Sequence, residues 1–230
     1  MLQRLSAPGG EACDCRDVMI VAAHPDDETI ALGELIAAMA LAGIGRKQLL
    51  SLAVPDQATS FGIAELAQKL AVILRDYRIR WVISHDFEGG HPDHDATAFV
   101  VYAACHLMRQ GGVRPPKVLE FPLYHLRKRC LIVQQFASAG EAATSRELPL
   151  DDATAAVKRR MLSQYLTQRR TLSVFAAAEE RVRRALKRSF LALPNGGEVY
   201  YAYFNWGLRP DDWAPLAANA SRELNLPEWL

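Results

Sequence analysis

The sequence predicts an α/β fold in which a mostly parallel sheet carries helices on both faces. Three observations predict this class. Apolar runs alternate with segments of helical periodicity over the first 112 residues, an order typical of parallel sheets. Glycines follow the first and third of these helical segments, as they do at many helix ends. The first and third apolar runs each end in a cluster of His, Pro and Asp.

The first half of the chain has the clearest pattern. "VMIVAAH" at 18–24 is continuously apolar, which is typical of a strand buried on both faces. The expected strands of this half are 18–24, 48–54 and 80–86. The expected helices are 28–45, 63–77 and 96–112. Residues 1–16 read as a loose polar lead-in.

The second half is less regular. Two further apolar segments follow at 117–125 and 130–137. The pattern then predicts a helix over 151–170, capped by Asp151 or Asp152, and a second, basic helix over 176–191. The run "EVYYAYFNWG" at 198–207 predicts a late strand, at an edge of the sheet. With no repeat and no linker, residues 1–230 are expected to form a single domain.

Composition excludes several classes of protein. Half of the 230 residues are apolar and the net charge is +1, which is ordinary for a soluble globular protein. This balance argues against nucleic-acid and membrane-surface partners. No stretch reads as a signal peptide or a membrane span, and the four cysteines are interpreted as free thiols. We therefore expect a cytoplasmic protein.

Two polar clusters lie where a ligand site is expected. In an open parallel sheet, ligands bind beyond the carboxyl ends of the strands. His24-Pro25-Asp26-Asp27-Glu28 follows the first apolar run, and His91-Pro92-Asp93-His94-Asp95 follows the third. If the two strands lie close together, both clusters face one crevice.

The residue types in these clusters suit a metal ion. Imidazole and carboxylate ligands favour zinc, with iron(II) or cobalt(II) as substitutes. A catalytic zinc takes about three protein ligands and leaves a position open, and a further carboxylate beside it accepts a proton from water. Either cluster alone is also typical of a helix start, where Asp and Glu cap the backbone or favour the positive end of the helix. The two clusters together favour a shared metal site.

"AHPDDETIALG" and "GGHPDHDATA" resemble the two signature motifs of the PIG-L, or LmbE-like, deacetylases. The resemblance extends from about Val18 to Phe99. It implies a Rossmann-like fold with the metal site at the carboxyl ends of the strands. It also implies a zinc-dependent hydrolase that removes acetyl groups, mostly from compounds containing N-acetylglucosamine.

The resemblance also implies roles for individual residues. His24, Asp27 and His94 would hold one Zn²⁺ per chain, and Asp26 would be the general base for the metal-activated water. His91 would stabilise the tetrahedral intermediate or protonate the leaving amine, and Asp93 would orient its imidazole. Glu28 is interpreted as a supporting residue or a helix-start residue.

The sequence departs from the family pattern at two places. Some members carry a tyrosine two residues before the first His of "HPDH", where this chain has Gly89; Tyr124 and His125 are candidates to replace it. A buried, hydrogen-bonded Tyr-His pair explains those two residues equally well. Members also carry a further strand-helix unit after the first helix, and we expect that unit to be missing here after about residue 33.

The leading hypothesis is a zinc-dependent N-deacetylase that acts on a small amino sugar or glycoconjugate. The sequence is compatible with a homo-oligomer. One alternative is a sugar-binding or partner-binding protein that keeps the metal site without turnover. Another is an amidase for an acyl group other than acetyl. Acetate release from N-acetylglucosamine derivatives distinguishes the deacetylase from the binding protein, and a panel of N-acyl glucosamines distinguishes it from the amidase.

Overall fold

The computed structural model describes residues 17–23, 31–137 and 145–228, and it confirms the α/β class. A five-stranded sheet has the order β1-β2-β3-β7-β6. Its strands are β1 (Val18–Val21), β2 (Trp81–His85), β3 (Lys117–Phe121), β6 (Arg146–Pro149) and β7 (Glu179–Arg184). β1, β2 and β3 pair in parallel, whereas β7 is antiparallel to both β3 and β6. Four of the five strands therefore share one direction.

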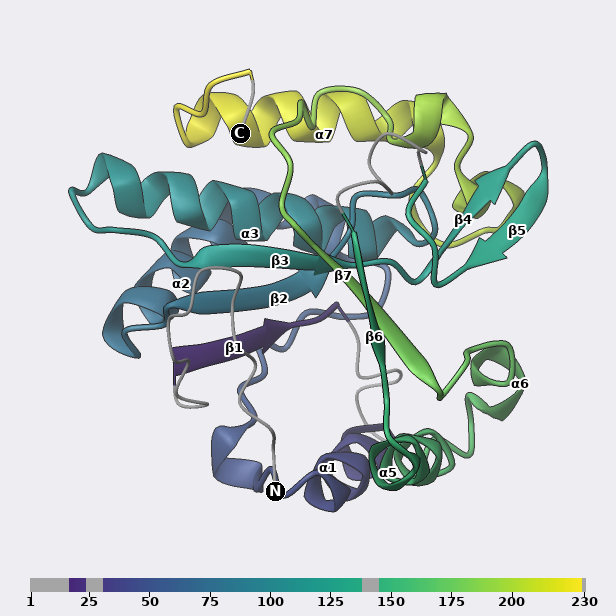
Figure 1. The fold of residues 1–230 in the computed structure, drawn as a ribbon. Coiled ribbons are helices and arrows are strands. Elements are labelled where there is room, and N and C mark those ends of the chain that lie inside the picture. Colours follow the sequence, from purple (N-terminus) through teal and green to yellow (C-terminus); the bar gives the residue numbers. More distant parts are fainter. Residues whose placement is uncertain (1–16, 24–30, 138–144, 229–230) are drawn as a thin grey trace.

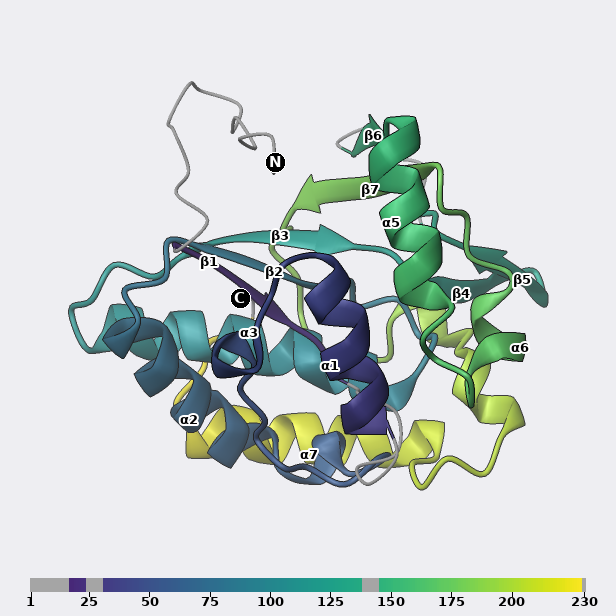
Figure 2. The same cartoon turned by 90° about the horizontal axis from the view of Figure 1, so that it is seen from below.

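Helices lie on both sides of this sheet (Figure 1). On one side are α2 (Ile63–Asp76), α3 (Pro92–Gln110) and α7 (Pro210–Glu223), and on the other are α1 (Ala31–Leu41) and α5 (Asp152–Leu162). Figure 2 shows α1 and α5 side by side. The short helix α6 (Arg169–Leu172) follows α5, and the loop between them donates hydrogen bonds to Glu34 of α1.

The helices of the first side form the main core. α2 repeats apolar residues at helical spacing, and its buried side chains pack against α3. α3 is buried on almost every side over its first turns, because α2, β2 and the C-terminal segments surround it. Trp213 of α7 closes this core and donates its indole N–H to the carbonyl of Phe190. The core thus holds α3 rigidly against β2.

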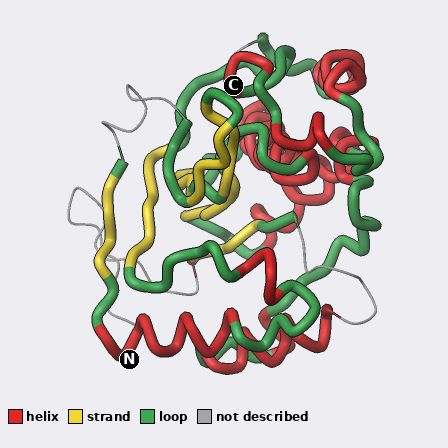
Figure 3. The backbone as a smooth tube through the Cα atoms, turned by 90° about the vertical axis from the view of Figure 1, so that its right-hand side faces the viewer, coloured by secondary structure: helices red, strands yellow, loops and turns green. Residues whose placement is uncertain are grey.

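A hairpin of β4 (Tyr124–Arg127) and β5 (Cys130–Val133) follows β3 directly. It lies beyond the carboxyl ends of β2 and β3. Figure 3 views the molecule from that side and shows loops gathered around this edge. The hairpin therefore places its first residue, Tyr124, beside the turn between β2 and α3.

Three sequence predictions are wrong. The predicted strand over 48–54 does not form. Gln48 ends a 3-10 helix (Arg46–Gln48), Ala53 has a φ of 53°, and Leu52 and Val54 pack against the core instead of pairing in the sheet. The predicted basic helix over 176–191 contains strand β7, because Arg183 pairs with buried carboxylates of β3 and the β2–α3 turn. The predicted strand over 198–207 contains a 3-10 helix, Tyr200–Tyr203, whose N-terminal amide donates to the Gly89 carbonyl.

The first strand is not buried on both faces as predicted, because β1 lies at the edge of the sheet and Ile20 is 62% exposed. The other element predictions hold with shifted ends. The expected 151–170 helix ends at Leu162, and the Asp151 side chain caps it by accepting from the Thr154 amide. Cys105 and Cys130 are free thiols. None of the described helices is long and apolar enough to cross a membrane. The cytoplasmic location and the homo-oligomer remain predictions.

Candidate metal and catalytic site

The predicted site residues divide into two groups. His24, Asp26, Asp27 and Glu28 lie outside the described residues. His91, Asp93 and His94 lie where β2 passes into α3, and all three are buried. His91, Asp93 and His94 lie at the carboxyl edge of the sheet, as the sequence predicts for them.

The turn between β2 and α3 places the N-terminus of α3 at this edge of the sheet. Gly89 adopts a φ of 81°, a left-handed conformation that favours glycine. Pro92 occupies the first helical turn, where its missing N–H costs nothing. His91 is the N-cap, and its Nδ1 accepts a hydrogen bond of 3.1 Å from the Asp93 amide. A neutral His91 ring therefore carries its hydrogen on Nε2.

Asp93 binds the loop that precedes α2. Its two carboxylate oxygens accept from the Gln57 amide at 2.7 Å and from the Thr59 amide at 3.1 Å. Charge-assisted bonds of this kind hold a loop firmly. Asp93 thus ties residues 57–59 to the start of α3, and its predicted influence on the His91 ring remains a prediction.

His94 stacks on a histidine that the sequence patterns did not single out. The rings of His94 and His85 lie 4.3 Å apart between centroids with an interplanar angle of 5°. His85 is the last residue of β2, and its Nε2 accepts a 3.0 Å hydrogen bond from the Ala23 amide. Its position at a strand end, six residues before His91, is the signal that sequence reading could have used.

Aromatic side chains surround the two site histidines. Trp206 lies 4.7 Å from the His91 ring, and Phe204 stacks on Trp206 at 4.4 Å. The Tyr124 ring contacts His94 edge-on at 5.6 Å and also contacts Tyr200. The segment mistaken for a strand, 198–207, therefore supplies part of the wall beside the site.

The geometry explains why no tyrosine stands at position 89. A Cβ at Gly89 would lie 2.9 Å from Cγ1 of Val199, besides the cost of its positive φ. Tyr124, by contrast, has its ring at His94. His125 lies 3.4 Å from the Glu88 carboxyl group and is fully buried. Of the two candidates to replace the tyrosine, Tyr124 is the one whose ring contacts a site histidine.

Two buried carboxyl groups, those of Asp95 and Glu88, stabilise the β2–α3 turn by accepting hydrogen bonds from backbone amides. Asp95 accepts from the Glu88 and Gly89 amides, and Glu88 accepts from the Leu123 and Tyr124 amides. Burial raises the pKa of Asp95 to about 8 and raises the pKa of Glu88 well above its usual range. Burial also lowers the pKa of His125. The bonds of Asp95 lie within the turn, and those of Glu88 link the turn to the start of the β4–β5 hairpin.

A buried cluster of four charges supports the end of β2. Arg183 contacts Asp86 at 2.6 Å and Glu120 at 2.9 Å, and Arg188 contacts the same two carboxylates at 2.9 Å each. The Tyr102 hydroxyl donates to Glu120 at 2.5 Å. We call Asp86, Glu120, Arg183 and Arg188 the charge quartet. A cavity of about 350 Å³ lies beside Arg188.

Among the described residues, His94 is the one that fits the predicted set of metal ligands. No group of three His, Cys, Asp or Glu side chains within the described ranges is arranged to hold a metal ion. His94 supplies a buried imidazole, and the Ala23 amide lies 3.0 Å from the ring stacked on it. Ala23, the residue before the first cluster in the sequence, is thus linked through His85 to His94.

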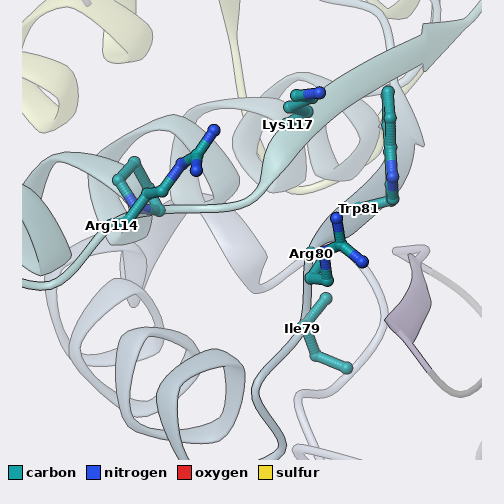
Figure 4. Close-up of a pocket in the computed structure, with 6 residues that line it drawn as sticks. Ile79, Arg80, Trp81, Arg114 and Lys117 are labelled. Atoms are coloured by element: carbon teal, nitrogen blue, oxygen red, sulfur yellow. The ribbon is translucent and has the colours of Figure 1, made fainter. Parts of the chain in front are cut away.

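A separate small hollow lies at the other end of the sheet. Its volume is about 100 Å³, and Figure 4 shows several of its lining residues, among them Arg80, Arg114 and Lys117 around Trp81. Lys117 Nζ lies 4.9 Å from the Trp81 ring centroid. Because these residues are at the amino ends of β2 and β3, the hollow is not part of the candidate site.

Replacing Gly90 with alanine is expected to destabilise the protein by about 1–3 kcal/mol. A methyl group there would overlap the carbonyl oxygen of Tyr124, so the turn or β4 must move. Urea unfolding measures the change. Gly111→Ala is the matched control, since the nearest atoms to its Cβ lie 3.6 Å away. Equal midpoints for the two variants would contradict the expectation.

Comparison with known proteins shows one family match. Residues 34–105 match the PIG-L family, described as GlcNAc-PI de-N-acetylase. This segment contains His91, Asp93 and His94 and begins after the first cluster. No curated protein matches the chain significantly.

Solved structures show a distant likeness. One is a deacetylase–bog complex from the biosynthesis pathway of teicoplanin, with 17% identity, 70% of this chain and 76% of that chain covered, and a TM-score of 0.45. Another is the zinc-inhibited form of the teicoplanin deacetylase Orf2, with 17% identity, 70% and 77% covered, and a TM-score of 0.42. A deacetylase–teicoplanin complex has 14% identity, 70% and 74% covered, and a TM-score of 0.42.

Proposed function

We propose that this chain, whose residues 34–105 match the PIG-L family, is a metal-dependent N-deacetylase of that family. Its substrate would be an N-acetylglucosamine-type amino sugar or glycoconjugate. The observation that carries the proposal is the pair of buried histidines, His91 and His94, at the start of α3 inside the segment that matches the family. Hydrolysis would break the amide C–N bond and release acetate and a free amine.

His24, Asp27 and His94 would hold one Zn²⁺, for which iron(II) or cobalt(II) could substitute. When bound, the ion polarises the amide carbonyl and lowers the pKa of water. The stacking of His94 on His85 supports this assignment, because a ligand imidazole needs a fixed ring plane.

The remaining residues would move protons and stabilise charge. Asp26 would take the proton from the attacking water. As a neutral ring, His91 would donate a hydrogen bond from Nε2 to the developing oxyanion, because its Nδ1 accepts from the Asp93 amide. To protonate the leaving amine, the ring would first have to take up a proton on Nδ1 and give up that bond. Asp93 would keep the start of α3 in place through its bonds to the Gln57 and Thr59 amides. Tyr124 would contribute at the oxyanion in place of a residue at position 89.

An acetate-release assay over N-acetylglucosamine derivatives tests the proposal. Acetate release that is lost with a chelator and restored with zinc is the expected result. Binding of an amino sugar by the intact protein without acetate release would overturn it and favour a binding protein. Release of propionate or a longer acid, with acetyl substrates inert, would favour an amidase for another acyl group.

Replacing His91 with glutamine is expected to lower kcat about 10²–10³-fold, the usual cost of one lost oxyanion donor, while the zinc content stays unchanged. Steady-state kinetics and metal analysis measure both. His106→Gln is the control, since His106 lies near the other end of the same helix. A His91→Gln enzyme as active as the control would contradict the role of His91.

A further inference from the structure

We propose that His85 is a positioning residue that joins Ala23, just past the end of β1, to His94 at the start of α3. Neither sequence motif includes it, and the family match assigns it no role. The inference concerns the folded chain itself. Only its consequence for metal binding rests on the proposed function.

The first observation is at the end of the β1–β2 ladder. The two strands pair in register up to Val21 and Ser84, and the Ser84 hydroxyl also donates to the Val21 carbonyl at 2.9 Å. Past this point the Ala23 amide donates to Nε2 of His85 at 3.0 Å. The imidazole thus takes the place of a backbone acceptor just before His24.

The second observation is on α3. The same imidazole stacks on His94 with nearly parallel rings, 4.3 Å between centroids. The Phe121 ring of β3 packs against His85 as well, at 5.1 Å. His85 is only 5% exposed, so its ring is enclosed by these neighbours. One side chain therefore touches the entry to the first cluster and the proposed ligand of the second.

The chemistry of the ring fits a positioning role. Because Nε2 accepts from an amide, it cannot also bind a metal ion, and a neutral ring carries its hydrogen on Nδ1. The stack restricts rotation of the His94 ring, and the amide bond restricts the backbone at Ala23. The residue after His85 is Asp86 of the charge quartet, which pairs with Arg183 and Arg188. These ion pairs fix the backbone next to His85.

Two variants separate the two contacts. His85→Gln keeps a side-chain acceptor but removes the ring, and His85→Phe keeps the ring but removes the acceptor. Hydrogen exchange at the Ala23 amide is the metal-free measurement. We expect protection to fall about tenfold or more in His85→Phe and to stay near wild type in His85→Gln. Equal protection in wild type and His85→Phe would overturn the proposal.

Metal binding is the second measurement. Both variants are expected to weaken zinc binding about 10–100-fold in a chelator competition, the usual effect of a lost supporting contact. The visible spectrum of the cobalt-substituted protein should change in His85→Gln, because the plane of His94 is then released. Val82→Ala is the control: it removes a buried core contact on the same strand and should lower thermal stability with zinc affinity unchanged.

Zinc affinities within twofold of wild type in both His85 variants would also overturn the proposal. Failure of the proposed function has a different signature. If the wild-type protein binds no zinc, the deacetylase assignment fails, and the Ala23 exchange result alone then decides whether His85 holds the strand exit.

Discussion

Asp26→Asn is expected to lower kcat about 10²–10⁴-fold while the protein keeps its metal ion, because the amide cannot accept the proton of the attacking water. Asp26, Asp27 and Glu28 are three consecutive carboxylates in the sequence, a few residues after the end of β1. The proposal gives each of them a different role: general base, metal ligand and supporting residue. Kinetics and metal content, measured on the same preparation, test this division of roles.

The neighbouring carboxylates are the matched controls. Asp27→Asn should lose the metal ion together with activity, since Asp27 is a proposed ligand. Glu28→Gln should keep both, because it has a supporting role at most. Full activity in Asp26→Asn, or loss of its metal ion, would show that the division between base and ligand is wrong.

Glu120→Gln is expected to lower the free energy of unfolding by about 3–5 kcal/mol, the usual cost of breaking a buried ion pair. Glu120 is fully buried and contacts both Arg183 and Arg188, so the substitution removes one of the two carboxylates that these guanidinium groups share. Urea unfolding measures the change. Tyr102→Phe, which removes only the hydroxyl bonded to Glu120, should cost about 1–3 kcal/mol and covers the case in which Glu120→Gln does not fold.

Glu147→Gln is a close control for this variant. Glu147 of β6 also pairs with an arginine of β7, Arg181, at 2.8 Å, but its side chain is 62% exposed. Solvent screens such a pair, so its removal should cost less than about 1 kcal/mol. Similar losses in Glu120→Gln and Glu147→Gln would contradict the special role of the buried quartet.

Local patterns were sufficient for α2, β2 and most of α3 in the first half of the chain. α2 has apolar residues at helical spacing and β2 is a short apolar run, whereas α3 begins at Pro92, four residues before the predicted start at 96. The two clusters were also readable, because the topology of a parallel sheet brings both strand ends to one edge. The structure confirms that β1 and β2 are neighbours.

The errors lie where distant partners override local preference. "EERVRR" reads as a basic helix, but the buried Asp86 and Glu120 select an extended β7 that delivers Arg183 to them. The aromatic run at 198–207 has the pattern of a strand, but its Trp206 ring packs against His91 and its Tyr200 ring packs against Tyr124. The apolar run at 48–54 packs against the core without a strand partner.

The α/β class, the two His/Asp clusters that follow strands and the resemblance to the PIG-L deacetylases can all be recognised without a structure. These are properties of short segments and their order. The charge quartet, the approach of Tyr124 to the site and the stack of His85 on His94 could not be recognised in this way. Each of those joins residues from different elements, and a ring contact or a buried ion pair exists only when packing brings both partners together and excludes water.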